Sequence, residues 1–381
     1  MRLFLHGGFA EKGRTSIGVE SRGYRLLLDA GVKTSARGRD YYPEITAEAL
    51  RATDAIIITH AHEDHLAALG WCIANGFKGR IFMTSETRRE MESCLSAYGE
   101  DGHWALAREA VVESLPVADA FHLGPFQIAT GRSGHVVGGV WCLLDDGRSR
   151  FLYCGDVVPA SPFLVMDRLP PCDAIAIDAS YADDAVPASD RGRQIANWIA
   201  AHASGCVLPT PLYGRSLDLF YIAPGPISLA AGMREALRAQ IESDRWLVDG
   251  ASRRLAARLE VAEIWLDDDV LPAAPLICHD AMGMAGPSRR ILALARALAH
   301  PTLFTGHMPD DSPGERMLRD GLGQWIRLPT HPTRDENLAL VAESGARVVL
   351  GHSCDGDALA RLGRFLPRLR TDAATGDSID L

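Results

Sequence analysis

Three histidines and an aspartate crowd into the segment THAHEDH, residues 59–65. The side chains that could do chemistry are His60, His62, Asp64 and His65. They follow an apolar run, residues 54–59, which is typical of a strand buried on both faces. Imidazole and carboxylate groups are good zinc ligands. The spacing therefore predicts that the first two histidines bind one divalent cation, while the aspartate and the last histidine face a second one.

Two cations held close together need further ligands and usually a bridging group. His135 lies in a glycine-flanked loop, SGHVVGG, and Asp156 and His352 each follow a short apolar run. Active-site residues gather where strand ends open into loops. We therefore expect a metal set with Asp156 as the bridge and Asp64 also counted as catalytic. The predicted ligands are His60, His62, Asp64, His65, His135, Asp156 and His352.

Short strands with tight turns dominate the first half of the chain. Residues 15–20 and 24–29 flank a Ser-Arg-Gly turn and predict a hairpin. A helical pattern runs from Glu63 until Gly76 ends it. Further strands are expected at residues 81–83, 125–130, 139–144, 151–154 and 174–177.

The pattern changes between about residues 190 and 325, where short apolar runs alternate with helical stretches, as in a small α/β domain with a parallel sheet. Strands are expected there at residues 206–209, 276–278 and 302–304, and helices at residues 234–241 and 288–299. The earlier pattern then resumes with a helix at residues 335–344, ended by Gly345, and a strand at residues 347–350. The final segment, residues 371–381, is expected to be frayed.

Composition narrows the class of protein. A chain of 381 residues exceeds the usual size of one domain, and 47% hydrophobic residues suffice for a packed core. The sequence has no apolar run of membrane-spanning length, and the eight cysteines form no Cys-x-x-Cys pair, which suits a reducing cytoplasm. The formal net charge of −10 argues against binding polyanions through bulk charge, so any nucleic-acid contact needs a local patch.

Taken in order, THAHEDHLAAL, SGHVVGG, LYCGD and LGH resemble the metal-binding motifs of the metallo-β-lactamase superfamily. Five further segments are similar to motifs of its β-CASP nucleases: residues 176–182, 208–219, 279–290, 303–318 and 330–352. The resemblance covers nearly the whole chain and implies an α/β fold, an αββα metallo-β-lactamase sandwich with an inserted α/β β-CASP domain. The sandwich would comprise residues 1–190 and 326–381, and the inserted domain residues 191–325.

The resemblance also implies a catalytic pair, Asp178 and His331. A carboxylate beside an imidazole raises the pKa of the imidazole, so His331 is expected to donate a proton to the leaving oxygen. Asp178 stands where the family commonly has Glu, and Pro332 and Thr333 stand where it commonly has Ala-Asp, so the geometry of the pair is open.

The function implied by the resemblance is hydrolysis of phosphodiester bonds in RNA by a zinc-dependent ribonuclease, an endonuclease, an exonuclease or both. Its cofactors would be two Zn²⁺ ions that activate water, with Mn²⁺ as an alternative. In the family a histidine at the position of His352 accompanies RNA processing, which favours single-stranded RNA as the partner. A homodimer is an open alternative to a single chain.

Three rival functions remain at this stage. A DNA exonuclease of the same fold would use the same metal set. A small-molecule metallo-hydrolase would not need the inserted segment, and a catalytically silent scaffold would not need a complete ligand set.

Several residues have two interpretations. Asp29 either orients a ligand histidine or belongs to a plain turn before Gly31, and Arg215 either contacts a phosphate or shapes a turn. A solvated helix face is expected for one arginine cluster, with a backbone-binding stripe as the alternative: Arg361, Arg364, Arg368 and Arg370. His279 and His307 are given no role.

Overall fold

The computed structural model describes residues 1–266 and 270–381. The chain divides into two compact units. Unit 1 comprises Met1–Ser161, Val165–Ala185 and His331–Leu381, and unit 2 comprises Pro162–Leu164 and Val186–Thr330. Within the described residues, the helices are all too short or too polar to cross a bilayer.

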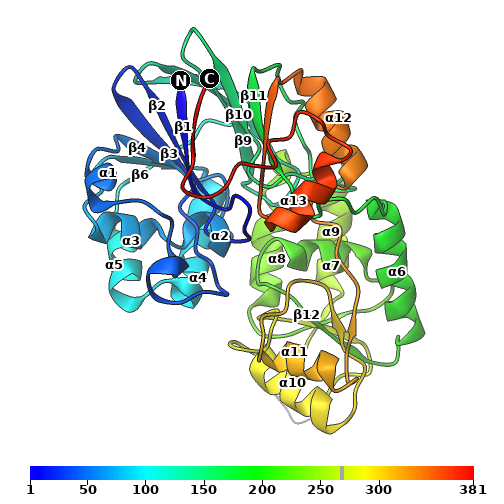
Figure 1. The fold of residues 1–381 in the computed structure, drawn as a ribbon. Coiled ribbons are helices and arrows are strands. Elements are labelled where there is room, and N and C mark those ends of the chain that lie inside the picture. The colour runs from blue at the N-terminus through cyan, green and yellow to red at the C-terminus, as the bar shows by residue number, and fades with distance from the viewer. Residues whose placement is uncertain (267–269) are drawn as a thin grey trace. The chain divides into compact units, whose positions relative to one another are not determined.

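Two mixed sheets form the centre of unit 1 (Figure 1). The first has the order β19-β1-β2-β3-β4-β5-β6; it is antiparallel from β19 to β3 and parallel from β3 to β6. Its strands are β1 (Arg2–Gly7), β2 (Ser16–Ser21), β3 (Tyr24–Leu28), β4 (Ala55–Ile57), β5 (Arg80–Met83), β6 (Val112–Ser114) and β19 (Ser378–Asp380).

The second sheet has the order β18-β11-β10-β9-β8-β7, with the first three strands parallel and the others antiparallel. Its strands are β7 (Ala120–Leu123), β8 (Phe126–Arg132), β9 (Val140–Asp145), β10 (Arg150–Tyr153), β11 (Ala174–Asp178) and β18 (Val348–His352). Asp178 and His352 are register partners at the ends of β11 and β18. The strand pairing therefore brings two of the predicted site residues together.

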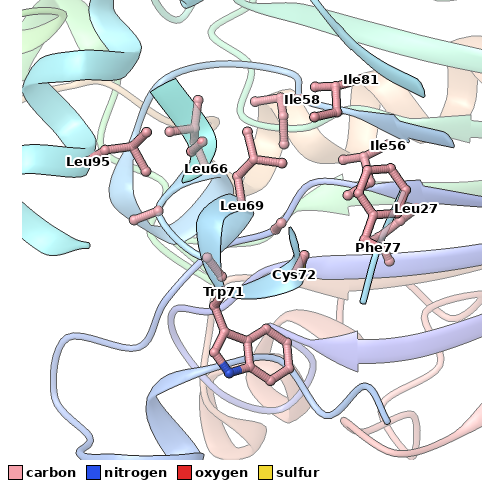
Figure 2. Close-up of a cluster of buried hydrophobic side chains, with 14 of the residues drawn as sticks. Leu27, Ile56, Ile58, Leu66, Leu69, Trp71, Cys72, Phe77, Ile81 and Leu95 are labelled. Carbon is pink, nitrogen blue, oxygen red and sulfur yellow. The ribbon is translucent and has the colours of Figure 1, made fainter. Parts of the chain in front are cut away.

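Helices cover the outer faces of both sheets (Figure 1). The first sheet carries α1 (Ala47–Arg51), α2 (Glu63–Leu66), α3 (Leu69–Ala74), α4 (Ser85–Tyr98) and α5 (Asp101–Glu109), with a 3-10 turn at Gly38–Tyr41; the second carries α12 (Arg334–Ser344) and α13 (Gly356–Gly363). Leu27 and Ile56 of the first sheet pack against Leu66 and Leu69 in a buried apolar cluster (Figure 2). This arrangement confirms the expected αββα sandwich.

The local sequence explains where the predicted elements begin and end. The hairpin of β2 and β3 turns through Arg22 and Gly23, both with positive φ, which matches the twist of the strands it joins. Thr333 and Glu336 form a capping box at the start of α12, and Gly345 ends that helix in the left-handed conformation. The predicted hairpin and the predicted helix stop are both confirmed.

Unit 2 contains a parallel four-stranded sheet of order β12-β15-β13-β14 and a two-stranded parallel sheet. The parallel sheet expected within residues 190–325 is therefore confirmed. The strands are β12 (Cys206–Pro209), β13 (Ser228–Leu229), β14 (Glu263–Ile264), β15 (Pro275–Cys278), β16 (Leu303–Phe304) and β17 (Gln324–Trp325). The helices are α6 (Ala188–Ala201), α7 (Arg215–Ile222), α8 (Met233–Ile241), α9 (Ala251–Glu260), α10 (Ser288–Ala297) and α11 (Pro313–Arg319), with a 3-10 turn at Asp244–Trp246.

Two expectations about helices and ends were wrong. The helix expected from Glu63 to Gly76 is two short helices, because the backbone N–H of Ala68 donates to the carbonyl of Ala30 (2.8 Å) and breaks the helical ladder. The tail is not frayed, because β19 pairs with β1 and the hydroxyl of Thr375 donates to Glu11 (2.7 Å).

The arginine cluster is not a helix face. Helix α13 ends at Gly363, so only Arg361 lies on it, where it pairs with Asp183 (3.1 Å). Arg368 donates to the carbonyl of Ala346 (2.9 Å), and Arg370 pairs with Asp372 (2.8 Å). The expected helix face is therefore wrong, while the backbone-binding stripe stays a prediction, since all four arginines are exposed.

Candidate metal centre

The segment after β4 is held from two sides. The backbone N–H of Thr59 donates to Asp29 Oδ1 (2.7 Å), and the carbonyl of Thr59 accepts from Val140 N at the start of β9 (3.1 Å). The carbonyl of Asp64 accepts from Thr15 N (2.9 Å), and Gly31 must be glycine because a Cβ there would lie 1.7 Å from that carbonyl oxygen. These contacts fix the backbone before any side chain meets a ligand.

One group of imidazoles, which we call the His62 half-site, comprises His60, His62 and His135. His62 Nδ1 lies 3.2 Å from His60 Nε2 and 3.1 Å from His135 Nε2. Asp156 Oδ2 lies 3.7 Å from His60 Nε2 and 3.5 Å from His135 Nε2. One ligand atom from each of these four residues lies within 4.8 Å of all the others, so the cluster could hold a metal ion.

A second group, the His65 half-site, comprises Asp64, His65 and His352. His65 Nε2 lies 3.2 Å from Asp156 Oδ1 and 3.8 Å from Asp64 Oδ2. His65 and His352 are completely buried, and their rings lie 6.1 Å apart. Asp156 lies between the two half-sites, with Oδ2 near the His62 half-site and Oδ1 near the His65 half-site. This is the position expected of a bridging ligand.

Three buried atoms fit a cation at the His65 half-site. His65 Nε2, Asp156 Oδ1 and His352 Nε2 are all buried and make no hydrogen bond to the described residues. Leaving buried polar atoms unsatisfied is costly, and such atoms are rare in native proteins. A divalent cation would satisfy all three, since a neutral imidazole nitrogen and a carboxylate oxygen are both metal ligands.

Neighbouring groups orient these imidazoles. Asp29 Oδ2 accepts hydrogen bonds from Thr59 Oγ1 (2.8 Å), His65 Nδ1 (2.7 Å) and Tyr153 OH (2.6 Å). The hydroxyl of Thr59 has one proton and donates it to Asp29. The Thr59 hydroxyl oxygen must therefore accept the hydrogen bond from His60 Nδ1 (3.0 Å). Both histidines therefore carry their proton on Nδ1 and present the lone pair of Nε2 to the centre. Of the two interpretations of Asp29, this geometry supports the orienting one.

Asp178 and His331 lie beside the bridge. His331 Nδ1 donates to Asp178 Oδ2 (2.8 Å) and lies 3.6 Å from Asp156 Oδ2. Asp178 Oδ1 accepts from both the backbone N–H (3.0 Å) and the hydroxyl (2.6 Å) of Ser180. Asn337 donates to the carbonyl of Asp178 (2.9 Å). The shorter Asp side chain thus reaches the imidazole.

The charges of the centre set its protonation. Burial opposes charge on both Asp178 and His331, but their mutual attraction outweighs it, lowering the pKa of Asp178 and raising that of His331. Burial lowers the pKa of His60 and of His352, which keeps both imidazoles neutral.

Burial also opposes charge on His65, but the carboxylates of Asp156, Asp64 and Asp29 outweigh it and raise the pKa of His65. The centre therefore combines two neutral imidazoles, His60 and His352, with two that favour their protonated form, His65 and His331. A cation at the His65 half-site would take the place of the proton on His65 Nε2.

Asp156, Asp178 and His331 form a second cluster in which one metal-ligating atom of each lies within 4.8 Å of the others. In that cluster, however, the Nδ1 atom of His331 is already engaged by Asp178. The unsatisfied atoms belong to His65, Asp156 and His352 instead. Hydrogen bonding therefore favours a proton-transfer pair at His331 and a second cation at the His65 half-site.

The remaining candidates lie in unit 2. Arg215 is the first residue of α7, and a Cβ on Gly306 would lie 1.5 Å from its Nη1, so the guanidinium packs over that glycine. The ring of His279 lies near the carbonyl of Ala231 (Nε2···O 3.2 Å), and His307 follows β16. All nine predicted ligand and catalytic residues, in contrast, lie in unit 1.

Several contributors carry no signal in the sequence. Thr59, Tyr153, Ser180 and Asn337 act on the site through hydrogen bonds to Asp29 or Asp178. Thr59 and Tyr153 each lie close to a ligand in the chain, at the end of a buried strand, which is the one local hint. The partners of Thr59, Tyr153 and Asn337 are distant in sequence, so only the fold reveals them, whereas Ser180 lies two residues after its partner Asp178.

The chain is similar to several known proteins. Residues 24–207 match a family model described as a beta-lactamase superfamily domain. The transcription termination factor FttA of Lokiarchaeum is 24% identical over 370 residues, covering 84% of this chain and 58% of that protein. The cleavage and polyadenylation specificity factor 73 of Drosophila melanogaster is 25% identical over 236 residues, covering 57% of this chain and 34% of that protein.

The endoribonuclease YSH1 of Yarrowia lipolytica is also 25% identical over 236 residues, covering 57% of this chain and 28% of that protein. The chain thus spans less than two thirds of the length of each of these curated relatives. A crystal structure of an Enterococcus faecalis protein of unknown function aligns over 100% of this chain and 99% of that one, with a TM-score of 0.63 and 13% identity, and so shows the fold alone.

The domain match, the paired sheets flanked by helices and the relatives lead to one conclusion. Residues 24–207 form a beta-lactamase superfamily domain, and the chain is similar in sequence to these three curated relatives.

Proposed function

We propose that this protein is a metal-dependent ribonuclease that hydrolyses phosphodiester bonds in single-stranded RNA. The observation that carries the proposal is the gathering, in one unit, of a bridged His/Asp cluster and a separate Asp178–His331 pair beside it. Two relatives support RNA as the substrate, since one is named an endoribonuclease and the other a cleavage and polyadenylation factor.

Two divalent cations fit the site, one held by the His62 half-site and one by the His65 half-site, with Asp156 shared. We propose Zn²⁺, with Mn²⁺ as an alternative, because the His62 half-site offers three imidazoles and the His65 half-site two imidazoles and two carboxylates. Such cations would supply Lewis-acid stabilisation of a phosphoryl oxygen and lower the pKa of water.

His331 is the proposed general acid. Its Nδ1–H donates to Asp178, so its Nε2 carries the proton that can be transferred to the departing sugar oxygen. Asp178 is fixed by Ser180 and stays ionised, which stabilises the imidazolium before the transfer. The side chain of His331 keeps 21% of its surface exposed, so a substrate can reach it.

A DNA exonuclease of the same fold is the second candidate, because the same metal centre could hydrolyse a phosphodiester bond of either RNA or DNA. The relatives favour RNA over it. Endonucleolytic or exonucleolytic cleavage, a cytoplasmic location and a homodimer stay predictions.

The test is cleavage of 5′-labelled single-stranded RNA, with a DNA of the same sequence as the comparison, in the presence of Zn²⁺ or Mn²⁺. We expect the wild type to cleave RNA, and His331→Gln to lose about 10²- to 10⁴-fold in rate while keeping its metal. His122→Gln, at an exposed histidine on β7, is the matched control and should cleave like the wild type. A wild type that cleaves neither substrate, or a His331→Gln variant of full activity, would refute the proposal.

A further inference from the structure

The loop between β1 and β2 lies against both ends of the His65 half-site. At its start, Ser353 N donates to the carbonyl of Gly8 (2.8 Å), and Phe9 forms a β-bridge with His352. At its end, Thr15 N donates to the carbonyl of Asp64 (2.9 Å). The loop is therefore attached to two of the residues that form this half-site, and Lys12 lies in the middle of it.

Internal ion pairs stiffen the loop. Glu11 Oε1 accepts from Arg14 Nε (2.8 Å) and from Thr375 Oγ1 (2.7 Å), and Glu11 Oε2 accepts from Lys33 Nζ (2.7 Å). Glu11, the carboxylate next to Lys12 in sequence, therefore pairs with Arg14 and Lys33. The Lys12 side chain is exposed, and no carboxylate among residues 1–266 and 270–381 pairs with it. A fixed loop therefore presents an uncommitted ammonium group to solvent.

The charge of Lys12 acts on two groups of the site, Asp64 and His331. Burial is the largest influence on the pKa of both Asp64 and His331, although each side chain keeps about a fifth of its surface exposed (23% and 21%). The charge of Lys12 lowers the pKa of each of them. The attachments of the loop place Lys12 three residues from Phe9, which pairs with His352, and three residues from Thr15, which bonds to Asp64, so its charge lies beside the His65 half-site.

We propose that Lys12 binds a phosphate of the substrate strand next to the one that is cleaved, and so sets part of the affinity for RNA. The inference rests on the proposed function. A chain with a net charge of −10 needs a local cation to attract a polyanion to an acidic centre. Lysine suits a backbone phosphate, because its ammonium is a compact charge on a flexible stem that does not depend on base identity.

The chain offers matched variants for the test. Lys12→Met removes the charge and keeps the length, Lys12→Arg keeps the charge, and Lys78→Met removes an equally exposed lysine from the turn between α3 and β5. The probe is a fluorescently labelled, non-cleavable 2′-O-methyl oligoribonucleotide. Its dissociation constant for each full-length variant is measured by anisotropy over a series of salt concentrations, and KM and kcat are measured with cleavable RNA.

We expect Lys12→Met to bind about fivefold more weakly at about 0.1 M salt, and the slope of log K against log salt to fall by about 0.7, as for one lost phosphate contact. KM should rise while kcat stays near the wild-type value. Lys12→Arg should restore most of the affinity, and Lys78→Met should behave like the wild type.

Two results would overturn the inference in different ways. If the wild type binds and cleaves RNA but Lys12→Met shows the same affinity and the same salt slope, Lys12 does not contact the substrate and the proposed function stands. If the wild type binds no RNA probe, both the inference and the proposed function are wrong.

Discussion

The two half-sites of the metal centre are built differently. In the His62 half-site, the imidazoles contact one another through their ring nitrogens, at 3.1 and 3.2 Å, and His62 is partly exposed. In the His65 half-site, His65 and His352 are fully buried, and each has a protein group on its Nδ1 and an unsatisfied Nε2. The imidazoles of the His65 half-site are thus all buried, whereas the His62 half-site has one imidazole, His62, that water can reach.

The difference has a physical cause. A buried imidazole cannot turn toward water, so its orientation must be set by neighbours such as Asp29 and Ser353. A partly exposed imidazole can meet water when no ligand is present, and it needs less support. We therefore expect the His65 half-site to depend on its supporting residues more strongly than the His62 half-site does.

Replacing the shared residue should have the largest effect. Asp156→Asn removes the charge that faces both half-sites, so we expect both cations to bind weakly and the rate of RNA cleavage to fall by about 10³-fold. Metal content and rate are measured on the same preparations. Asp145→Asn, at the end of β9, is the control and should match the wild type. Loss of one cation alone would show that Asp156 does not serve both half-sites.

Replacing the orienting carboxylate should separate the half-sites. Asp29 holds His65 directly but His60 only through Thr59. We therefore expect Asp29→Asn to lower the affinity of the His65 half-site for its cation by about 10- to 100-fold, and that of the His62 half-site by less. Tyr153→Phe removes one of the donors to Asp29 and should cost less, which keeps the comparison testable if Asp29→Asn folds poorly. Competition with a chelator measures both affinities. Equal weakening of the two half-sites would contradict the asymmetry described above.

A smaller effect is expected from the helix that supports the His62 half-site. The hydroxyls of Thr84 and Thr87 at the start of α4 donate to the carbonyl of Gly138 (2.9 and 3.2 Å), in the loop that carries His135.

Further along α4, burial raises the pKa of Glu90 to about 8. A buried carboxyl with a raised pKa binds its proton more tightly in the folded state than in the unfolded state.

The folded protein should therefore lose stability as the pH rises from the unfolded pKa of Glu90, near its ordinary value of 4.5, to about 8. Glu90→Gln removes this loss, so we expect the variant to be more stable than the wild type by about 1–2 kcal/mol at pH 8, and by little near pH 5. Thermal unfolding of metal-free protein at both pH values measures this. A stability difference that does not change with pH would contradict the buried, protonated carboxyl.

Residue type and spacing predicted which side chains gather at this centre, because ligation needs particular side chains at strand ends. The same reasoning could not reveal Tyr153 as a partner of Asp29, since the two residues lie in different sheets and meet only when the sandwich closes. Nor could it reveal the order of the tail, because β19 is stabilised by pairing with β1 at the other end of the chain. Local patterns predict elements, whereas contacts between distant elements decide how the ligands are oriented.

The most direct test of the two half-sites is the metal content of protein purified without chelator. We expect about two divalent cations per chain in the wild type and about one in each of two variants, His62→Ala and His352→Ala, with elemental analysis as the readout. A wild type that carries no stoichiometric metal, even after incubation with Zn²⁺ or Mn²⁺, would contradict the account of this centre.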